Sequence, residues 1–194
     1  MDNALDGLKI GFGVTGSFCT IFKIIPVIRR LRGCGAAVFP ILSENTSATD
    51  TRFGSSADFT AQITEASGST PMTSITQVEP IGPKQLFDVL VVAPCTGNSI
   101  AKIANGISDT TVTLAVKSHL RNNRPVVIAV STNDGLSGNA KNIGVLLSRK
   151  NIYLVPLGQD DFMDKENSLV SDFDRVEDTV ISALNGRQIQ PILI

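Results

Sequence analysis

The 194-residue sequence has no tryptophan, one tyrosine and one histidine. A Ser/His/Asp or Cys/His relay therefore has only one possible base, His119. This histidine stands in a polar helical segment beside Lys117 and Arg121, so we expect it to be a solvated surface residue. Hydrolase chemistry of the relay type is not expected.

Cysteine is also scarce. Cys19, Cys34 and Cys95 are widely spaced and odd in number, so they form neither a disulfide framework nor a zinc pattern. We therefore expect a reducing cytoplasm. The acidic run at residues 160–166 lacks the spacing of a calcium loop, so we expect a solvated loop and no metal ion.

The sequence lacks both a basic block and a long apolar run. It has 17 basic and 18 acidic residues, with a formal net charge of −1. Nucleic acid and anionic membrane surfaces are therefore not expected as partners. No run approaches the ~18 apolar residues that span a membrane, and the first residues lack a charged-then-apolar signal segment. These features predict a soluble, cytoplasmic protein.

What is present is an alternation of apolar runs and helical spacers. Strands are expected at 8–14, 36–42, 72–76 (weakly), 88–93, 126–130 and 152–155, and helices at 17–32, 56–66, 99–105, 110–122 and 139–149. Pro26 should kink the first of these helices. Repeated strand–helix–strand units predict an α/β fold with a doubly wound parallel sheet in a three-layer α/β/α sandwich, Rossmann-like in type. Residues 1–194 are expected to form one domain.

The C-terminal part is less regular. Residues 158–171 are polar and are expected to form a surface loop. Ser171 is expected to cap a final helix over residues 172–184, with Gly186 beyond its end. The tail over residues 187–194 ends in Pro-Ile-Leu-Ile. Such an apolar end is expected to pack on the protein body or on a neighbouring subunit.

The first strand leads into a glycine-rich turn, GFGVTGS, at residues 11–17. It fits G-x-G-x-x-G between a strand and a helix, which predicts a phosphate site. A dinucleotide site would also need an acid at the end of the second strand, where Ser43 precedes Glu44. A hydroxyl suits a phosphate better, so Thr15, Gly16, Ser17 and Ser43 are the expected phosphate clamp. Two alternatives remain: the glycines serve only a tight turn and close packing, or they form a nicotinamide site with Glu44.

Two further polar loops follow expected strands. The uninterrupted run 89–93 leads into Pro94-Cys95-Thr96-Gly97-Asn98-Ser99, and the run 126–130 leads into residues 131–135, STNDG. For residues 94–99, the alternative is a helix N-cap at Asn98 or Ser99 above a buried free cysteine. Because carboxyl ends of parallel strands meet at one edge of a sheet, the three loops together predict a ligand cleft.

The segments GVTGS (13–17), VVAPCTGNSIAKIANGISD (91–109) and RPVVIAVSTN (124–133) resemble the flavoprotein family of homo-oligomeric flavin-containing cysteine decarboxylases and flavin prenyltransferases. The resemblance covers roughly residues 8–155. It implies an FMN site at a subunit interface, in a trimer or a multiple of trimers. The cofactor-binding residues it implies are Gly13, Thr15, Gly16, Ser17, Ser43, Ala93, Pro94, Cys95, Thr96, Asn98 and Ser99.

Two departures from the family pattern bear on the reaction. Where the decarboxylases have an essential histidine, before the strand at 88–93, this chain has residues 79–83, EPIGP. Their proline–methionine–asparagine motif is replaced by Ser131, Thr132 and Asn133. Cysteine decarboxylation is therefore not expected, although Asn133 stands where the decarboxylases hold a substrate carboxylate. A prenyl-phosphate site cannot be matched either.

The segments 78–98, 130–136 and 150–161 resemble one branch of the family, a component of a two-subunit oxidoreductase of spore-forming bacteria. This implies a partner subunit that carries NADPH, a small dicarboxylate substrate and a place in the mother-cell cytoplasm. Asn98, Lys102 and Asn133 are the expected substrate-binding residues, because Lys102 follows Asn98 by one helical turn. No general base is assigned; Cys95 could serve only with a depressed pKa. An FMN-dependent cysteine decarboxylase and a non-catalytic nucleotide-binding partner subunit remain alternatives.

Overall fold

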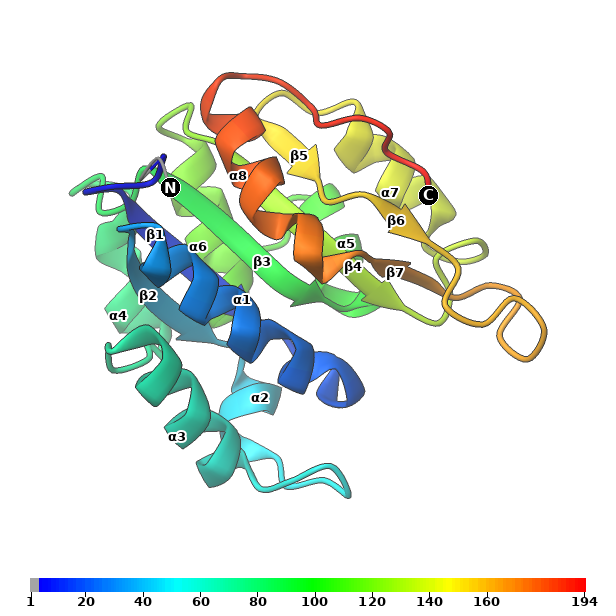
Figure 1. Ribbon diagram of the computed structural model, residues 1–194, viewed down its shortest axis with the longest axis horizontal. Coiled ribbons are helices and arrows are strands. Elements are labelled where there is room, and N and C mark those ends of the chain that lie inside the picture. The colour runs from blue at the N-terminus through cyan, green and yellow to red at the C-terminus, as the bar shows by residue number, and fades with distance from the viewer. Residues whose placement is uncertain (1–3) are drawn as a thin grey trace.

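A seven-stranded sheet forms the centre of the computed structural model, which describes residues 4–194 (Figure 1). Residues 1–3 of the expected domain lie outside the described residues. The strands are β1 (Lys9–Val14), β2 (Ala37–Leu42), β3 (Val89–Cys95), β4 (Val126–Thr132), β5 (Ile152–Leu154), β6 (Leu157–Gly158) and β7 (Leu169–Ser171). Their order is β2-β1-β3-β4-β7-β6, and β5 also pairs with β4. The first five strands are parallel, as predicted, whereas β7 is antiparallel to both β4 and β6.

Helices cover both faces of the sheet, which confirms the three-layer sandwich (Figure 1). They are α1 (Ile21–Gly33), α2 (Glu44–Ala48), α3 (Ser56–Ser67), α4 (Ile75–Val78), α5 (Gly97–Ala104), α6 (Thr111–Leu120), α7 (Ala140–Leu147) and α8 (Val176–Leu184). Helices α1, α3 and α8 pack on one face, and α4 to α7 pack on the other. Pro26 lies inside α1, and the helix continues through it to Gly33.

The alternation along β1 explains two of its glycines. Phe12 faces the core under α1, while Gly11 and Gly13 face the opposite layer. A Cβ at Gly11 would lie 2.6 Å from side-chain atoms of Leu90 and Phe87, and one at Gly13 would lie 3.0 Å from Val112 Cγ1. A side chain at Gly11 would therefore overlap its neighbours, and one at Gly13 would force Val112 to shift.

The central strand β3 is buried along its whole length, as expected for a strand covered on both faces. It continues to Cys95, two residues beyond the end expected from the sequence. Its register against β4 shifts between Val92 and Cys95, where the Ala93–Pro94 peptide is cis. The polar loop after β3 therefore begins at Thr96.

Two expected elements are wrong. Met72 forms only an isolated bridge with Ile41, and no strand covers residues 72–76. The cause is local, because Ser74 and Gln77 form a capping box that starts α4 at Ile75. Ser171 is not a helix cap but the end of β7, and residues 158–171 therefore include strand at both ends.

Ser171 forms hydrogen bonds to neighbouring strands and does not cap a helix. Its hydroxyl accepts a hydrogen bond from the Val130 N–H at 2.8 Å and donates one to the Val155 carbonyl at 3.2 Å. It thereby links β7 to the parallel part of the sheet. Asp172 caps a short 3₁₀ turn instead, and α8 begins at Val176.

The expectation for His119 is also wrong. Its side chain is buried, with 1% of its surface exposed, and Nε2 lies 3.1 Å from the Pro125 carbonyl oxygen. Burial lowers the pKa of His119 to about 4. The prediction relied on Lys117 and Arg121, but residues two apart on a helix do not share a face. Lys117 and Arg121 are more exposed, while His119 points inward.

The C-terminal tail packs on the body in part. The Leu157 N–H donates to the Ile192 carbonyl at 3.0 Å, and Ile192 packs against the core. Leu193 and Ile194 are 70% and 60% exposed.

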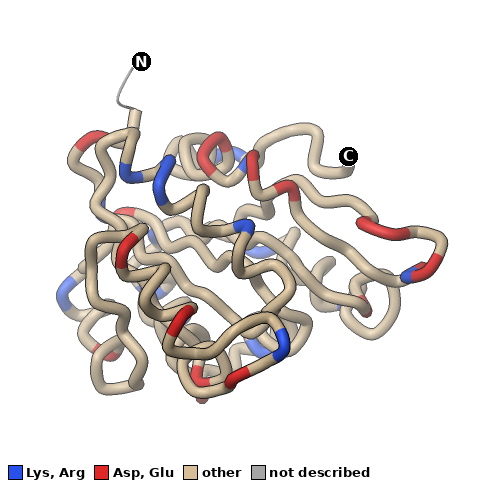
Figure 2. Tube along the Cα trace, turned by 60° about the horizontal axis from the view of Figure 1, so that its bottom comes forward, with Lys and Arg blue, Asp and Glu red and all other residues tan. Residues whose placement is uncertain are grey.

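Acidic and basic residues are spread along the chain (Figure 2). Within the described part, no helix is both long and apolar enough to cross a membrane.

Candidate functional site

The three polar loops predicted from the sequence meet at the carboxyl edge of β1, β3 and β4, which are neighbours in the sheet. The Thr15 hydroxyl donates to the Pro94 carbonyl at 2.8 Å and accepts from the Thr96 N–H at 2.9 Å. The hydroxyls of Ser17 and Ser131 lie 2.9 Å apart. These bonds tie the first loop to both of the others.

Two adjacent hollows open at this edge. The smaller, called the hydroxyl hollow, has a volume of about 250 Å³ and is lined by Thr15, Gly16, Ser43, Glu44, Asn45, Thr96, Asn98, Ser99, Lys102, Asp109 and Thr110. The larger, called the wide cleft, measures about 480 Å³ and is lined by Gly16, Ser17, Phe18, Cys19, Thr20, Arg52, Phe53, Thr96, Gly97, Ser131, Thr132, Asn133, Asp160, Lys165, Ser168 and Val170. Gly16 and Thr96 belong to both hollows, so the two form one continuous candidate site.

The amino end of α5 forms one wall of the hydroxyl hollow. Thr96 is its N-cap, and the Thr96 side chain accepts from the Ser99 N–H at 3.4 Å. The helix therefore starts two residues before the expected Ser99. The first amides of a helix have no intrahelical partner, and they favour an anion. Ser43 adds a hydroxyl from the cap of α2, where it accepts from the Thr46 N–H at 3.3 Å.

The charged groups of the hydroxyl hollow are already engaged. Lys102 Nζ lies 2.8 Å from Asp109 Oδ1, and this hydrogen bond lowers the pKa of Asp109. Glu44 accepts from both the N–H and the hydroxyl of Thr111, at 2.9 and 2.8 Å. Glu44 thus holds the start of α6, which argues against its use as the ribose acid of a nicotinamide site. The hollow offers hydroxyls and amides more than free charge.

A polar cluster stands behind the wide cleft. Asp134 Oδ1 accepts from the Thr132 hydroxyl at 2.5 Å, and the Asn139 amide donates to both carboxylate oxygens at 2.9 and 2.8 Å. The bonds from Thr132 and Asn139 lower the pKa of Asp134. Asn142 in turn donates to Asn139 at 2.8 Å. This cluster fixes the loop that presents the exposed Asn133 to the cleft.

Gly97 lies directly against that cluster. A Cβ at this position would be 2.5 Å from Thr132 Oγ1, 2.6 Å from Asn139 Nδ2 and 2.8 Å from Asp134 Oδ1. Such distances do not occur between these atom types without a shift of the surroundings. Only glycine lets the start of α5 approach the loop after β4 this closely, and that approach closes the back of the site.

The predicted site residues do not all line the same hollow, and some line neither. Asn98 and Lys102 line the hydroxyl hollow, whereas Asn133 lines the wide cleft, so the three expected substrate residues do not share one hollow. Ala93 and Cys95 are fully buried in opposite layers and line neither hollow. Pro94, also buried, contributes its carbonyl oxygen as the acceptor for Thr15, and Gly13 lies in β1.

Burial raises the pKa of the Cys95 thiol far above its usual range, so Cys95 is not a general base. Cys19 is exposed at the wide cleft. With iodoacetamide at pH 8, we expect native protein to be alkylated at Cys19, while Cys95 reacts only after denaturation. Peptide mass spectrometry after timed quenching measures this order, and native-state labelling of Cys95 at the rate of Cys19 would contradict it.

Sequence reasoning missed Arg52, Phe53 and Lys165. Arg52 lies over the Phe53 ring, with its guanidinium carbon 4.9 Å from the ring centroid, in the segment between α2 and α3. Lys165 comes from the loop between β6 and β7 and lies 3.5 Å from Asp160. The segment between α2 and α3 and the loop between β6 and β7 both reach the wide cleft, although neither follows β1, β3 or β4 directly in the sequence. No periodicity or motif marked them, because their placement depends on the tertiary fold.

Known proteins match this chain in sequence and in fold. A family model described as Flavoprotein matches residues 2–185. The B subunit of dipicolinate synthase from Bacillus subtilis (strain 168) is 45% identical over 192 residues, which covers 99% of this chain and 96% of that protein. The crystal structure of the corresponding B subunit from Bacillus halodurans C is 42% identical, with a TM-score of 0.90 over 98% of this chain and 97% of that one. The FMN-dependent cysteine decarboxylase SpaF shares the fold, at 22% identity and a TM-score of 0.68 over 92% of this chain and 96% of that one.

Proposed function

This chain belongs to the flavoprotein family, and we propose that it is the flavin-associated component of a dipicolinate synthase. The observation that carries the proposal is the 45% identity to the B subunit of a dipicolinate synthase over 99% of the chain. In this proposal it acts with the A subunit of dipicolinate synthase, which carries NADPH and is called the partner subunit below. Together they convert a dihydrodipicolinate-type precursor into pyridine-2,6-dicarboxylate in the mother-cell cytoplasm during sporulation.

The continuous site fits FMN in size and chemistry. The hydroxyl hollow provides Ser43 and the amino end of α5 for a phosphate, without a free carboxylate, since Glu44 and Asp109 are both engaged. The Thr15 hydroxyl braces the wall of this hollow through its bonds to Pro94 and Thr96. The wide cleft, joined to it at Gly16 and Thr96, provides room for a flat ring. When bound, FMN would supply a hydride acceptor or donor. Gly16, Ser17, Asn98 and Ser99 complete the proposed cofactor-binding residues.

A dianionic substrate needs cations, and the site supplies them on the wide-cleft side. Lys102 is neutralised by Asp109, and its side chain is only 21% exposed. Among residues 4–194, no carboxylate forms an ion pair with Arg52. We therefore add Arg52 to Asn133 as the proposed carboxylate-binding pair. Lys165 lines the same cleft but is paired with Asp160. Asn98 and Lys102 then act on the cofactor side.

Arg52→Gln is expected to raise the KM for the dicarboxylate substrate by about 10-fold or more, because a charge-assisted hydrogen bond contributes roughly 1.5–3 kcal/mol. FMN affinity should fall by less than the KM rises, because Arg52 does not line the hydroxyl hollow, where the FMN phosphate is placed. Steady-state kinetics with the partner subunit measure the KM, and flavin titration measures the FMN affinity. Arg29→Gln, on an exposed pair with Glu65, is the matched control. An unchanged KM would remove Arg52 from the substrate site.

The function is tested by reconstitution. Purified chain, partner subunit, NADPH or NADP⁺ and the dihydrodipicolinate-type precursor are combined with and without FMN, and pyridine-2,6-dicarboxylate is quantified by its ultraviolet absorbance after chromatography. Product that requires both subunits supports the proposal. Product formed at the same rate when this chain is omitted would contradict it.

Flavin dependence separates a catalytic role from that of a non-catalytic partner subunit. Faster product formation with added FMN supports a catalytic flavin, whereas a rate independent of bound FMN supports a structural partner. The decarboxylase alternative lacks a histidine base at the site, because His119 is the only histidine and is buried beside Pro125. Carbon dioxide release from a cysteine-terminated peptide would reinstate that alternative.

A further inference from the structure

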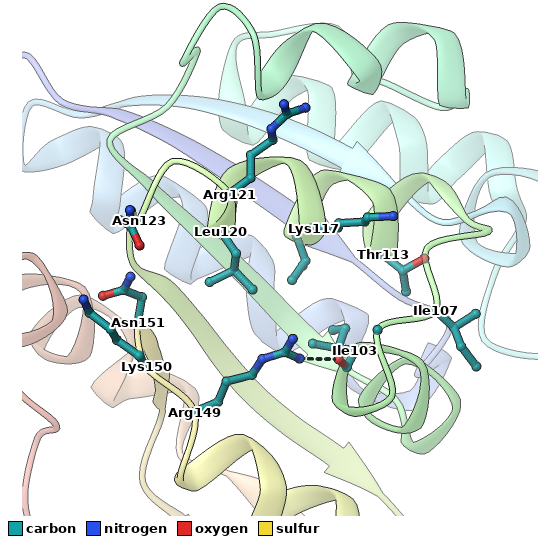
Figure 3. A pocket seen from close by; sticks show the side chains of 12 residues that line it. Ile103, Ile107, Thr113, Lys117, Leu120, Arg121, Asn123, Arg149, Lys150 and Asn151 are labelled. Carbon is teal, nitrogen blue, oxygen red and sulfur yellow. Dashed lines mark hydrogen bonds between the residues drawn. The ribbon is translucent and has the colours of Figure 1, made fainter.

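A third hollow of about 370 Å³, here called the basic trough, lies between α5, α6 and the turn that follows α7 (Figure 3). Its lining residues include Asn123, just before β4, and Asn151, just before β5. The trough therefore reaches the amino edge of the sheet, and it shares no lining residue with either hollow of the candidate site. The candidate site lies at the carboxyl edge, so the two are separate.

The trough combines an apolar floor with positive charge. Ile103 and Leu120 contribute to its floor, and its charged lining residues are Lys117, Arg121, Arg149 and Lys150. Its lining includes no acidic residue, and among residues 4–194 none of the four cations forms an ion pair. Arg149 is held in place by a hydrogen bond from its guanidinium to the Ile103 carbonyl at 2.9 Å, drawn in Figure 3. Such a surface suits a partner that is both acidic and apolar.

The same chain carries a segment of that chemistry. Residues 161–164, Asp-Phe-Met-Asp, here called the acidic tip, lie in the loop between β6 and β7 that projects from the body (Figures 1 and 2). Phe162 is 67% exposed and Met163 is 76% exposed, more than the other large apolar side chains of the described residues, apart from Leu193 near the C-terminus. Within residues 4–194, neither Asp161 nor Asp164 forms an ion pair.

Internal hydrogen bonding gives the tip a defined turn. The Asp164 N–H donates to Asp161 Oδ1 at 3.1 Å, and the Lys165 N–H donates to the Asp161 carbonyl at 2.8 Å. The turn presents two adjacent apolar side chains between two acids. A contiguous exposed apolar patch rimmed by polar groups is typical of an interaction site. The trough offers the converse arrangement, apolar in the middle and positive around it.

We propose that the acidic tip of one copy docks in the basic trough of a second copy of this chain. Charge complementarity favours this occupant over other segments, because the tip unites unpaired acids with unpacked apolar side chains. Tip and trough lie at opposite edges of one molecule, so the contact joins two copies head to tail. Such a contact closes into a ring when the rotation between copies permits.

The contact links assembly to the candidate site. Asp160, Lys165 and Ser168, on either side of the tip, line the wide cleft. Docking of the tip on a neighbour therefore fixes one wall of the cleft, whichever ligand the cleft takes. The proposal does not depend on the proposed function, because it concerns the surface and not the reaction.

Site-specific photo-cross-linking tests the contact. The full chain is made with p-benzoylphenylalanine in place of Phe162, mixed with isotopically heavy copies of the unaltered chain, irradiated and digested for mass spectrometry. We expect light–heavy cross-links to peptides that contain Ile103, Leu120 or Arg149. Cross-links confined to the same copy, or to peptides outside the trough, would overturn the proposal.

A charge exchange provides a second, independent test. Lys117→Glu with Lys150→Glu, and separately Asp161→Lys with Asp164→Lys, should each weaken self-association by about 10-fold or more, as measured by analytical ultracentrifugation. The combined variant should recover most of the loss. Circular dichroism confirms that each variant is folded, and Arg29→Glu is the control reversal on an unrelated exposed pair. Unchanged association in all variants would overturn the proposal.

Discussion

Gly97→Ala is expected to abolish measurable FMN binding and to lower the free energy of unfolding by roughly 1–3 kcal/mol. The added methyl group would overlap Thr132 Oγ1 at 2.5 Å and Asn139 Nδ2 at 2.6 Å, and neither atom can retreat while it bonds Asp134. Relief requires the start of α5 to move away from the loop after β4. That movement opens the wide cleft and displaces Thr96, which belongs to both hollows.

The measurement pairs flavin titration with urea unfolding, and Gly144→Ala is the matched control. Gly144 lies inside α7 with nothing within 4 Å of a built Cβ. Its replacement should raise the free energy of unfolding by roughly 0.5–1 kcal/mol and leave FMN binding unchanged. If Gly97→Ala bound FMN as tightly as Gly144→Ala, the close approach at Gly97 would have no part in the site.

The free energy of unfolding is expected to fall steeply as the pH decreases, because of His119. Burial lowers the pKa of His119 to about 4, whereas in the unfolded chain it is about 6.5. Between these values the unfolded chain binds a proton that the folded protein does not, so stability falls as pH decreases. We expect this residue alone to cost roughly 3 kcal/mol of unfolding free energy between pH 7 and pH 4.

Chemical denaturation at intervals from pH 7.5 to pH 4 measures the effect, with His119→Gln as the comparison. The variant is less stable at pH 7, because it disturbs the bond to the Pro125 carbonyl, but its stability should decline much less over pH 6.5–4. Asp134, with a lowered pKa, contributes its own loss only as pH falls below about 4, outside that window. Equal slopes in the two proteins would contradict a buried, neutral His119.

The parallel core of the fold could be predicted because its signals are local and strong. The run Val89–Ala93 has no polar residue, which is typical of a strand covered on both faces, and the strand–helix alternation specifies parallel pairing. The antiparallel pair β6 and β7 could not be predicted, since β6 has two residues and β7 has three. Their pairing rests on tertiary contacts such as the Ser171 hydroxyl at Val130.

In the candidate site too, residues with a local sequence signal could be predicted, whereas residues placed by tertiary contacts could not. Thr15, Gly16, Thr96, Asn98 and Asn133 were identified because polar loops after parallel strands must share one edge. Ala93 and Cys95 were included by resemblance, and the burial of β3 on both faces places their side chains in the two cores.

Other features of the site depend on contacts across the fold. The engagement of Lys102 by Asp109 depends on the path of the chain between α5 and α6. Arg52 and Lys165 depend on loops whose course follows no periodic pattern. Sequence reasoning therefore located the edge and its hydroxyls, while the charged residues around the site required the structure.

The proposed function requires FMN to bind at the edge formed by the loops after β1, β3 and β4. Flavin titration of the purified chain, followed by quenching of FMN fluorescence, tests this directly when unaltered protein is compared with Asn98→Ala. We predict saturable binding by the unaltered chain and an affinity at least about 10-fold lower in the variant, because Asn98 lines the hydroxyl hollow at the start of α5. Equal affinity in the two proteins, or no binding by the unaltered chain with or without the partner subunit, would show that this edge does not hold the flavin.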